Sequence, residues 1–169
     1  MDALEAILSR RSIRKYIKKE IPEQVITELL KAGMSAHSAG NEQPWHFVVI
    51  DDRTLLNEIP AFHPHSKMLK EAAVTILVCR DHQLDTHKGM WVQDCAAATE
   101  NILLAAHAKQ LGAVWLGIYP REERVTGMRK LCTIPDHVIP FSLISIGYPG
   151  EHKPPADRYD DSRVHHNKW

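Results

Sequence analysis

A dense run of cations and hydroxyls near the N-terminus is the part of this sequence best equipped for chemistry. Ser9–Tyr16, with the sequence SRRSIRKY, carries four cationic side chains and two serine hydroxyls. Arginine offers planar, bidentate donors to phosphate, and serine adds a neutral donor. The run therefore predicts an anionic partner, which is a nucleic-acid backbone, a lipid headgroup or the phosphate of a small cofactor.

The overall charge of the chain bears on that choice. Twenty-one acidic residues balance 21 basic ones, so the formal net charge is zero. A dedicated nucleic-acid binder usually carries a basic excess, and a neutral chain has no global field that draws it to an anionic membrane. No apolar run approaches the length of a membrane span, and the first residues lack the apolar core of a signal peptide. We expect a cytoplasmic protein with no nucleic-acid or membrane partner.

Histidine and cysteine form no recognisable metal motif. The three cysteines lie in apolar segments without CxxC spacing, which predicts buried, reduced thiols, with a catalytic thiol as the weaker alternative. They are Cys79, Cys95 and Cys132. The pairs His63/His65 and His165/His166 lack further ligands at the spacing of a zinc site, so we expect surface histidines and no bound metal.

Alternating helical and strand patterns predict one layered domain over residues 1–169. Continuous apolar runs predict strands at 46–50, 74–79, 113–118 and 141–146, and apolar stripes predict helices at 2–9, 22–32, 89–111 and 121–131. Continuous apolar strands indicate a sheet covered on both faces, as in an α+β or α/β domain. The polar, proline-rich tail, Glu151–Trp169, is expected to be an arm that reaches another subunit.

Two further segments are suited to a flat heterocyclic ligand. The first is Gly40–Trp45, with the sequence GNEQPW, in which Asn and Gln each offer both donors and acceptors to the edge of a ring. The second is Gly112–Gly117, whose terminal glycines allow a ligand to approach the backbone closely.

With these segments in this order, the sequence resembles the flavin-dependent nitroreductases. The resemblance rests on Arg10–Arg14, Ser38–Trp45, Gly112–Gly117, and Gly147–Pro149 followed by Arg158. It spans nearly the whole chain. It implies an α+β fold with a mixed central sheet flanked by helices, and an obligate homodimer with one FMN at each of two interface sites. It also implies that the extended C-terminal arm is exchanged between the subunits.

The resemblance assigns roles to the cationic run. Arg10 and Arg158 would hold the FMN phosphate, while Arg11 and Ser12 would contact the phosphate or the ribityl chain. Arg14 would lie near the N1 and O2 edge of the isoalloxazine. A cation there stabilises the negative charge of the reduced ring and so raises its reduction potential.

The resemblance also assigns roles to the two ring-binding segments. Asn41 would bond the ring system with Gln43 in support, and Ser38 and its neighbours would come from the partner subunit. The backbone of Trp115, Leu116 and Gly117 would face the flavin, with one amide directed at N5. No side-chain acid or base is required because the flavin supplies the redox chemistry. His37, where relatives often carry proline, would either donate a proton to the substrate or make a structural hydrogen bond.

The activity implied by the resemblance is oxidation of NAD(P)H and reduction of an electron-poor small molecule such as a nitroaromatic or a quinone, in two flavin-mediated steps. The segments 51–72 and 81–88 are short, so the shape of the substrate channel is left open. One alternative is a flavin-binding protein with little NAD(P)H turnover, or one reduced by a protein partner. A nucleic-acid binder, the third possibility, would be colourless and salt-sensitive.

Overall fold

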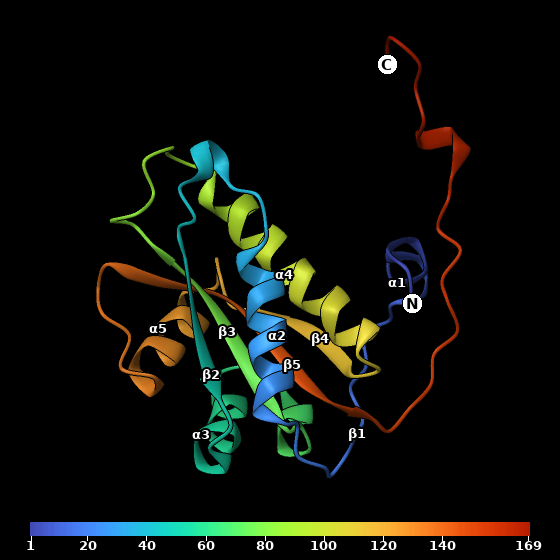
Figure 1. Ribbon diagram of the computed structural model, residues 1–169. Helices are drawn as coiled ribbons and strands as arrows, with labels where there is room; N and C mark the ends of the chain where they lie inside the picture. The colour runs from blue at the N-terminus through green and yellow to red at the C-terminus, as the bar shows by residue number, and fades with distance from the viewer.

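The long strand β5 (Val138–Pro149) organises the sheet (Figure 1). The computed structural model describes all 169 residues. β5 pairs with β3 (Val74–Asp81) on one side and β4 (Gly112–Gly117) on the other. β2 (Trp45–Ile50) lies beyond β3, and the short β1 (Tyr16–Ile17) pairs with the end of β5. All four ladders are antiparallel, and the parallel pairing in this otherwise antiparallel sheet is a single bridge between Ser12 and Ala113.

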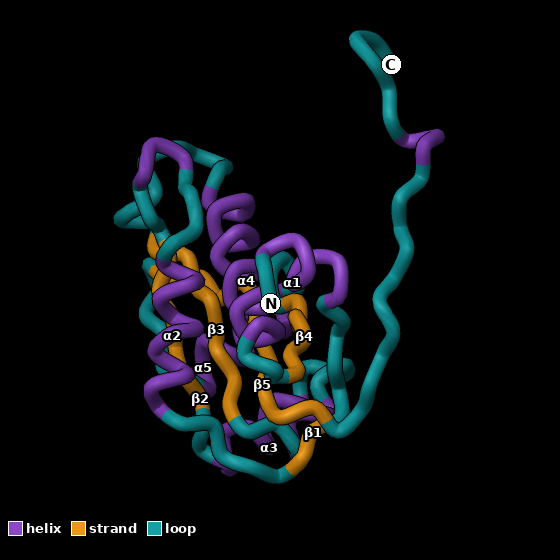
Figure 2. Tube along the Cα trace, turned by 45° about the vertical axis from the view of Figure 1, so that its right-hand side comes forward, coloured by secondary structure: helices purple, strands orange, loops and turns teal.

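Helices cover both faces of this sheet (Figure 2). They are α1 (Ala3–Ser9), α2 (Glu23–Met34), α3 (Arg53–Glu58), α4 (Trp91–Ala108) and α5 (Glu122–Leu131). Because side chains alternate along a strand, Ile76 and Val78 of β3 enter the core that includes α2 and α4. Leu77 and Cys79 enter the second core, with α3 and α5. The α+β fold class and the two covered faces are therefore confirmed.

Close packing between α2 and α4 explains one wrong helix boundary. The sequence predicts a second helix over 22–32 with Gly33 just after its end, whereas α2 continues to Met34. Gly33 is buried against α4, and a Cβ there would come within 2.9 Å of Ile102 Cδ1. This glycine therefore allows the helices to approach each other and does not end the helix.

The connection from β2 to β3 contains elements that the sequence analysis did not predict. α3 is capped by Asp52, whose side chain accepts hydrogen bonds from the amides of Thr54 and Leu55. Two single-turn 3-10 helices follow, η2 (Ile59–Ala61) and η3 (Lys67–Lys70). A third, η1 (Ala39–Asn41), precedes β2. These elements are too short to show an apolar period.

Two apolar surfaces lie uncovered on the chain, one on the segment after β5 and one on α1. The chain after β5 leaves the body as an extended arm with one 3-10 turn, η4 (Asp161–Arg163), as Figure 1 shows. Tyr159 and Trp169 on this arm, and Leu4 and Leu8 on α1, are exposed. Exposed apolar surface of this kind is typical of an interaction site. None of the helices combines the length and apolar character needed to cross a bilayer.

Candidate functional site

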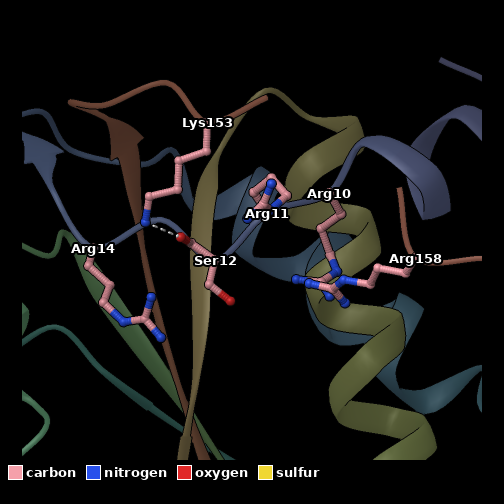
Figure 3. Close-up of a pocket in the computed structure, with 6 residues that line it drawn as sticks. All are labelled: Arg10, Arg11, Ser12, Arg14, Lys153 and Arg158. Carbon is pink, nitrogen blue, oxygen red and sulfur yellow. Dashed lines mark hydrogen bonds between the residues drawn. The ribbon is translucent and has the colours of Figure 1, made fainter. Parts of the chain in front are cut away.

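A cavity of about 220 Å³ lies beside the segment that follows α1 (Figure 3). It is lined by five cations and one hydroxyl, with no acidic and no apolar residue among them. The residues are Arg10, Arg11, Ser12, Arg14, Lys153 and Arg158. We refer to this set as the cationic pocket. It unites four residues of the N-terminal run with two residues of the C-terminal arm, which lie near the other end of the sequence.

The segment after α1 is held in an extended conformation by Ile13. The Ile13 amide donates to the Ala113 carbonyl of β4 at 3.0 Å, and the Tyr16 hydroxyl donates to the Ile13 carbonyl at 2.8 Å. The buried Ile13 side chain packs on Gly112, where a Cβ would come within 2.6 Å of Ile13 Cγ2. Since alternate residues of an extended chain share a side, anchoring Ile13 inward leaves Ser12 and Arg14 free to line the pocket.

Two guanidinium groups meet at one end of the cationic pocket. Arg10 forms a 3.1 Å ion pair with Glu100 of α4, while Arg158 has no acidic partner. In Figure 3, the side chains of Arg10 and Arg158 extend from different segments toward the same point. Like charges repel, so this arrangement favours an anion such as phosphate between them.

Lys153 and Arg14 lie at the other end, where the arm is tied to the N-terminal segment. Lys153 Nζ donates to the Ser12 carbonyl at 2.8 Å and pairs with Glu151 at 3.2 Å. The Arg14 amide donates to the same Glu151 carboxylate at 2.7 Å. This bond, with Lys153, lowers the pKa of Glu151 below its ordinary value. Arg11 donates to the Pro154 carbonyl, so its guanidinium is already partly occupied.

The adjacent edge of β4 presents free backbone amides. The Ile118 amide bonds to Phe141 of β5, whereas the Ala113 carbonyl accepts from Ile13 on the opposite side. Because antiparallel strands alternate in this way, the amides of Trp115 and Gly117 are directed away from β5. The amide of Leu116 is directed toward β5, and the Leu116 side chain is buried. Trp115 and Gly117 are therefore the backbone donors that this edge offers to a ligand.

Two side chains hold the end of β4 in place. The Gly117 carbonyl accepts from His63 Nε2 at 3.1 Å and from Arg124 Nη1 at 2.7 Å. Burial, followed by the charge of Arg124, lowers the pKa of His63, which keeps the imidazole neutral. The expectation of a surface histidine at His63 is wrong, because the residue is 1% exposed. Nothing in the sequence distinguishes this histidine from its exposed neighbour His65.

The residues around η1 form a separate group, which we call the η1 loop (residues 38–43). Ser38 Oγ accepts from the Gln43 amide, and Gln43 Nε2 donates to Asn41 Oδ1, both at 3.0 Å. Gly40, Asn41 and Gln43 all have positive φ, at 55°, 56° and 48°. Two non-glycine residues in this region indicate local strain, which clusters at functional sites.

The fold of one chain does not bring the η1 loop to the cationic pocket. The Ala39 amide bonds to Asp94 in the first turn of α4. Arg10 and Ser9 instead contact Glu100 and His107, further along the same helix. In Figure 1, η1 and α1 accordingly lie at opposite ends of α4. The exposed His37 belongs to the η1 end.

Neither a metal centre nor a reactive thiol competes with this site. No group of three or more His, Cys, Asp or Glu side chains is placed to hold a metal ion. All three cysteines are free. Cys79 and Cys95 are buried as expected, whereas the expectation is wrong for Cys132, which is only partly buried. Burial raises the pKa of Cys79 to about 12 and also raises that of Cys95, so both stay protonated and unreactive.

Sequence reasoning found most of the cationic pocket and missed its supports. Lys153 was not predicted, although a second cation in the tail close to Arg158 was a usable signal. Arg124 carries no comparable signal in the sequence, yet it donates to the Gly117 carbonyl. Both contacts depend on chain segments meeting in space, which one sequence does not encode in its spacing.

Comparisons with known proteins give a consistent result. The family model described as the nitroreductase family matches residues 7–64 and 60–148. A Methanothermobacter thermautotrophicus protein named NADH dehydrogenase/NAD(P)H nitroreductase is 53% identical, covering 100% of this chain and 88% of that protein. A Clostridium acetobutylicum structure described as an NADH oxidase superimposes with a TM-score of 0.94 at 42% identity, covering 97% and 99%. A Desulfovibrio desulfuricans nitroreductase in complex with FMN gives 0.86 at 30% identity, covering 100% and 99%.

Proposed function

Because the chain belongs to the nitroreductase family, we propose that it is an FMN-dependent oxidoreductase that takes electrons from NAD(P)H and works as a homodimer. The observation that carries this proposal is the cationic pocket next to the free amides of β4. The pocket has the donors for a phosphate, and the strand edge has the donors for a ring system.

The residues of this chain fit the phosphate end of FMN. Arg10 and Arg158 would clamp the phosphate, and no acidic residue lines the pocket to repel it. Ser12 supplies a neutral hydroxyl, and Lys153 adds a positive charge while it fixes the Ser12 backbone. Arg11 would contribute less than the other arginines, since the Pro154 carbonyl already accepts from it.

The residues also fit the ring end. When bound, FMN would accept electrons from NAD(P)H and pass them to a second substrate in a separate half-reaction. Arg14 would favour negative charge at the N1 and O2 edge, and the amide of Trp115 or Gly117 would donate near N5. His63 and Arg124 would act as positioning residues, since both hold the Gly117 carbonyl.

We infer the homodimer from the separation of the two residue groups. The η1 loop is bonded to the first turn of α4, whereas Arg10 contacts Glu100 further along that helix. The loop residues Ser38, Asn41 and Gln43 therefore do not reach the cationic pocket of their own subunit and would complete the partner's pocket. The exposed apolar faces of α1 and the arm would be covered in the same assembly, with the arms exchanged. Each flavin would then contact both subunits.

The second substrate is proposed to be an electron-poor small molecule such as a nitroaromatic or a quinone, which would enter after the nicotinamide leaves. His37 would either donate a proton to this substrate or only support the loop. The alternative remains a flavin-binding protein with little NAD(P)H turnover or one reduced by another protein.

Anaerobic titration tests the proposed function. The purified protein should be yellow, NADH or NADPH should bleach it, and a quinone or nitroaromatic should restore the colour. A yellow protein that neither nicotinamide bleaches would overturn the reductase proposal and favour the flavin-binding alternative. A colourless protein that FMN cannot reconstitute would overturn both.

A further inference from the structure

Two buried carboxyl groups lie where the η1 loop meets α4, outside the cationic pocket. Asp94, in the first turn of α4, is 3% exposed. The side chain of Glu42, directly after η1, is also 3% exposed. Asp94 Oδ1 accepts from the Ala39 amide at 3.1 Å. Glu42 Oε2 accepts from the amide and hydroxyl of Thr86 at 2.7 and 3.0 Å, and from the amide and Nδ1 of His87 at 2.8 and 3.1 Å. We refer to these two groups as the acid pair.

The second oxygen of each group has no donor. Asp94 Oδ2 and Glu42 Oε1 are both enclosed, and neither accepts a hydrogen bond from any protein donor. Both groups adjoin the same residue, because Asp94 Oδ1 accepts from the Ala39 amide and the Glu42 amide donates to the Ala39 carbonyl at 3.1 Å. Two ionised carboxylates placed in this way would repel each other and leave two buried acceptors unpaired, and both effects are unfavourable. One proton between the two oxygens removes both difficulties.

We propose that Asp94 is a neutral carboxylic acid whose Oδ2 donates a proton to Oε1 of Glu42, and that this bond latches the η1 loop to α4. Asp94 and Glu42 are positioning residues in this proposal, since neither lines the cationic pocket. The bond connects three segments: α4 through Asp94, the η1 loop through Ala39 and Glu42, and the 86–87 turn through Thr86 and His87.

The surroundings decide which member of the pair holds the proton. Burial alone would raise the pKa of Glu42, but the bonds from His87 and Thr86 outweigh burial and lower the pKa to about 2. Burial raises the pKa of Asp94, and the neighbouring Glu42 raises it further against the Ala39 amide and His37. Glu42 is therefore the anion and Asp94 the acid.

The other charged groups nearby do not change this assignment. His37 on the η1 side and His87 on the 86–87 turn are the remaining titratable groups that contact the pair or act on it. Arg80 and Asp85 act on the adjacent Cys95 and are paired with each other at 2.9 Å. No cation other than a protonated histidine is therefore positioned to stabilise a second carboxylate.

The latch has a consequence for the ligand site, and this step rests on the proposed function. Asn41 and Gln43 hold left-handed backbone conformations that persist only when neighbouring contacts enforce them. Gly40 packs so closely on His87 that a Cβ would come within 2.2 Å of the ring. Loss of the Asp94 proton would place a second negative charge against Glu42, so the loop would loosen and its grip on the partner's flavin would weaken as pH rises.

Infrared spectroscopy of the protein as purified tests the proton directly. A pH-difference spectrum should contain the carbonyl stretch of a buried carboxylic acid at neutral pH, and this band should vanish as the pH is raised. In Asp94→Asn the band should be missing from the start. Identical difference spectra for the wild type and Asp94→Asn would overturn the proposal whether or not the protein binds flavin.

Flavin retention as a function of pH tests the latch. The side-chain amide that Asp94→Asn introduces can accept from the Ala39 amide and donate to Glu42, so it imitates the protonated acid at every pH. We expect FMN dissociation from the wild type to rise about tenfold between neutral and alkaline pH, which corresponds to about 1.4 kcal/mol, and to stay flat in Asp94→Asn. A parallel rise in both proteins would overturn the latch. A protein that never binds FMN would defeat the proposed function, while the infrared result would still decide the acid pair.

Discussion

The cationic pocket and the acid pair solve opposite electrostatic problems. In the pocket, Arg10 and Arg158 converge with no acid between them, and the surface remains open to an outside anion. In the acid pair, Asp94 and Glu42 are closed from solvent and are satisfied from within by amides, a hydroxyl, an imidazole and one proton. The pocket is thus built for a ligand, while the acid pair is built to fix a loop.

The difference explains why one region could be found from the sequence and the other could not. Cations that await a ligand cluster in the sequence itself, as Arg10–Arg14 do. A buried acid that satisfies its neighbours looks like any surface acid until the fold is known. Asp94 and Glu42 are separated by 52 positions and share no motif.

Removing the phosphate clamp should have the largest effect. We expect Arg158→Ala to weaken FMN binding by about tenfold to a hundredfold, because a charge-assisted hydrogen bond contributes roughly 1.5–3 kcal/mol. Arg10→Ala should act in the same direction, although it also removes the ion pair with Glu100. The dissociation constant can be measured from the fluorescence of released flavin. Unchanged flavin content in both variants would contradict the phosphate assignment.

Acid titration of stability should show the next largest effect and isolates Glu42. Its pKa is about 2 in the folded protein and about 4.5 ordinarily, so its contribution is complete above pH 4.5 and disappears as the pH falls toward 2. Discounted for screening by solvent, this shift corresponds to about 2 kcal/mol. Urea unfolding between these pH values should therefore weaken more steeply for the wild type than for Glu42→Gln. Equal slopes would contradict the assignment of Glu42 as the anion.

Truncation of Asp94 should separate the loss of a bond from the loss of a charge. Asp94→Ala leaves the Ala39 amide and Glu42 Oε1 without partners, and we expect it to lower the free energy of unfolding by about 2 kcal/mol. Asp94→Asn retains both contacts and serves as the matched control. Chemical unfolding at neutral pH measures the difference, and equal losses in the two variants would count against the latch.

The smallest effect is expected within the pocket itself, at Arg11. Its guanidinium already donates to the Pro154 carbonyl, so Arg11→Ala should weaken FMN binding by only a few-fold. Fluorescence of released flavin measures this change as well. A loss as large as that of Arg158→Ala would show that Arg11 leaves Pro154 to hold the phosphate.

The sequence predicted the scaffold of the fold because its strands are nearly continuous in apolar residues. Strand β3 is buried on both faces, so its run of Val, Ile and Leu was visible without the structure. The short elements between β2 and β3 were missed, because single turns have no period to detect. The predicted end of the second helix was wrong at Gly33, because a glycine that ends a helix and one that packs against another helix look the same in sequence.

In the candidate site, too, some contacts could be predicted from the sequence and others could be seen only in the fold. The sequence run placed Arg10, Ser12 and Arg14 together, and the family resemblance had added Arg158. The structure brings Arg158 to the same pocket and adds Lys153. His63 and Arg124 reach Gly117 from distant segments, so their contacts appear only when β4 and α5 are placed in space. The roles assigned to Ser38, Asn41 and Gln43 stay predictions, because they depend on a second subunit.

Sedimentation followed through flavin absorbance tests the central claim most directly, since that claim is one FMN held between two subunits. The flavin should move with a particle of twice the 19.2 kDa of one chain, carrying one FMN per chain. Flavin that sediments with a stable single subunit would contradict the shared site.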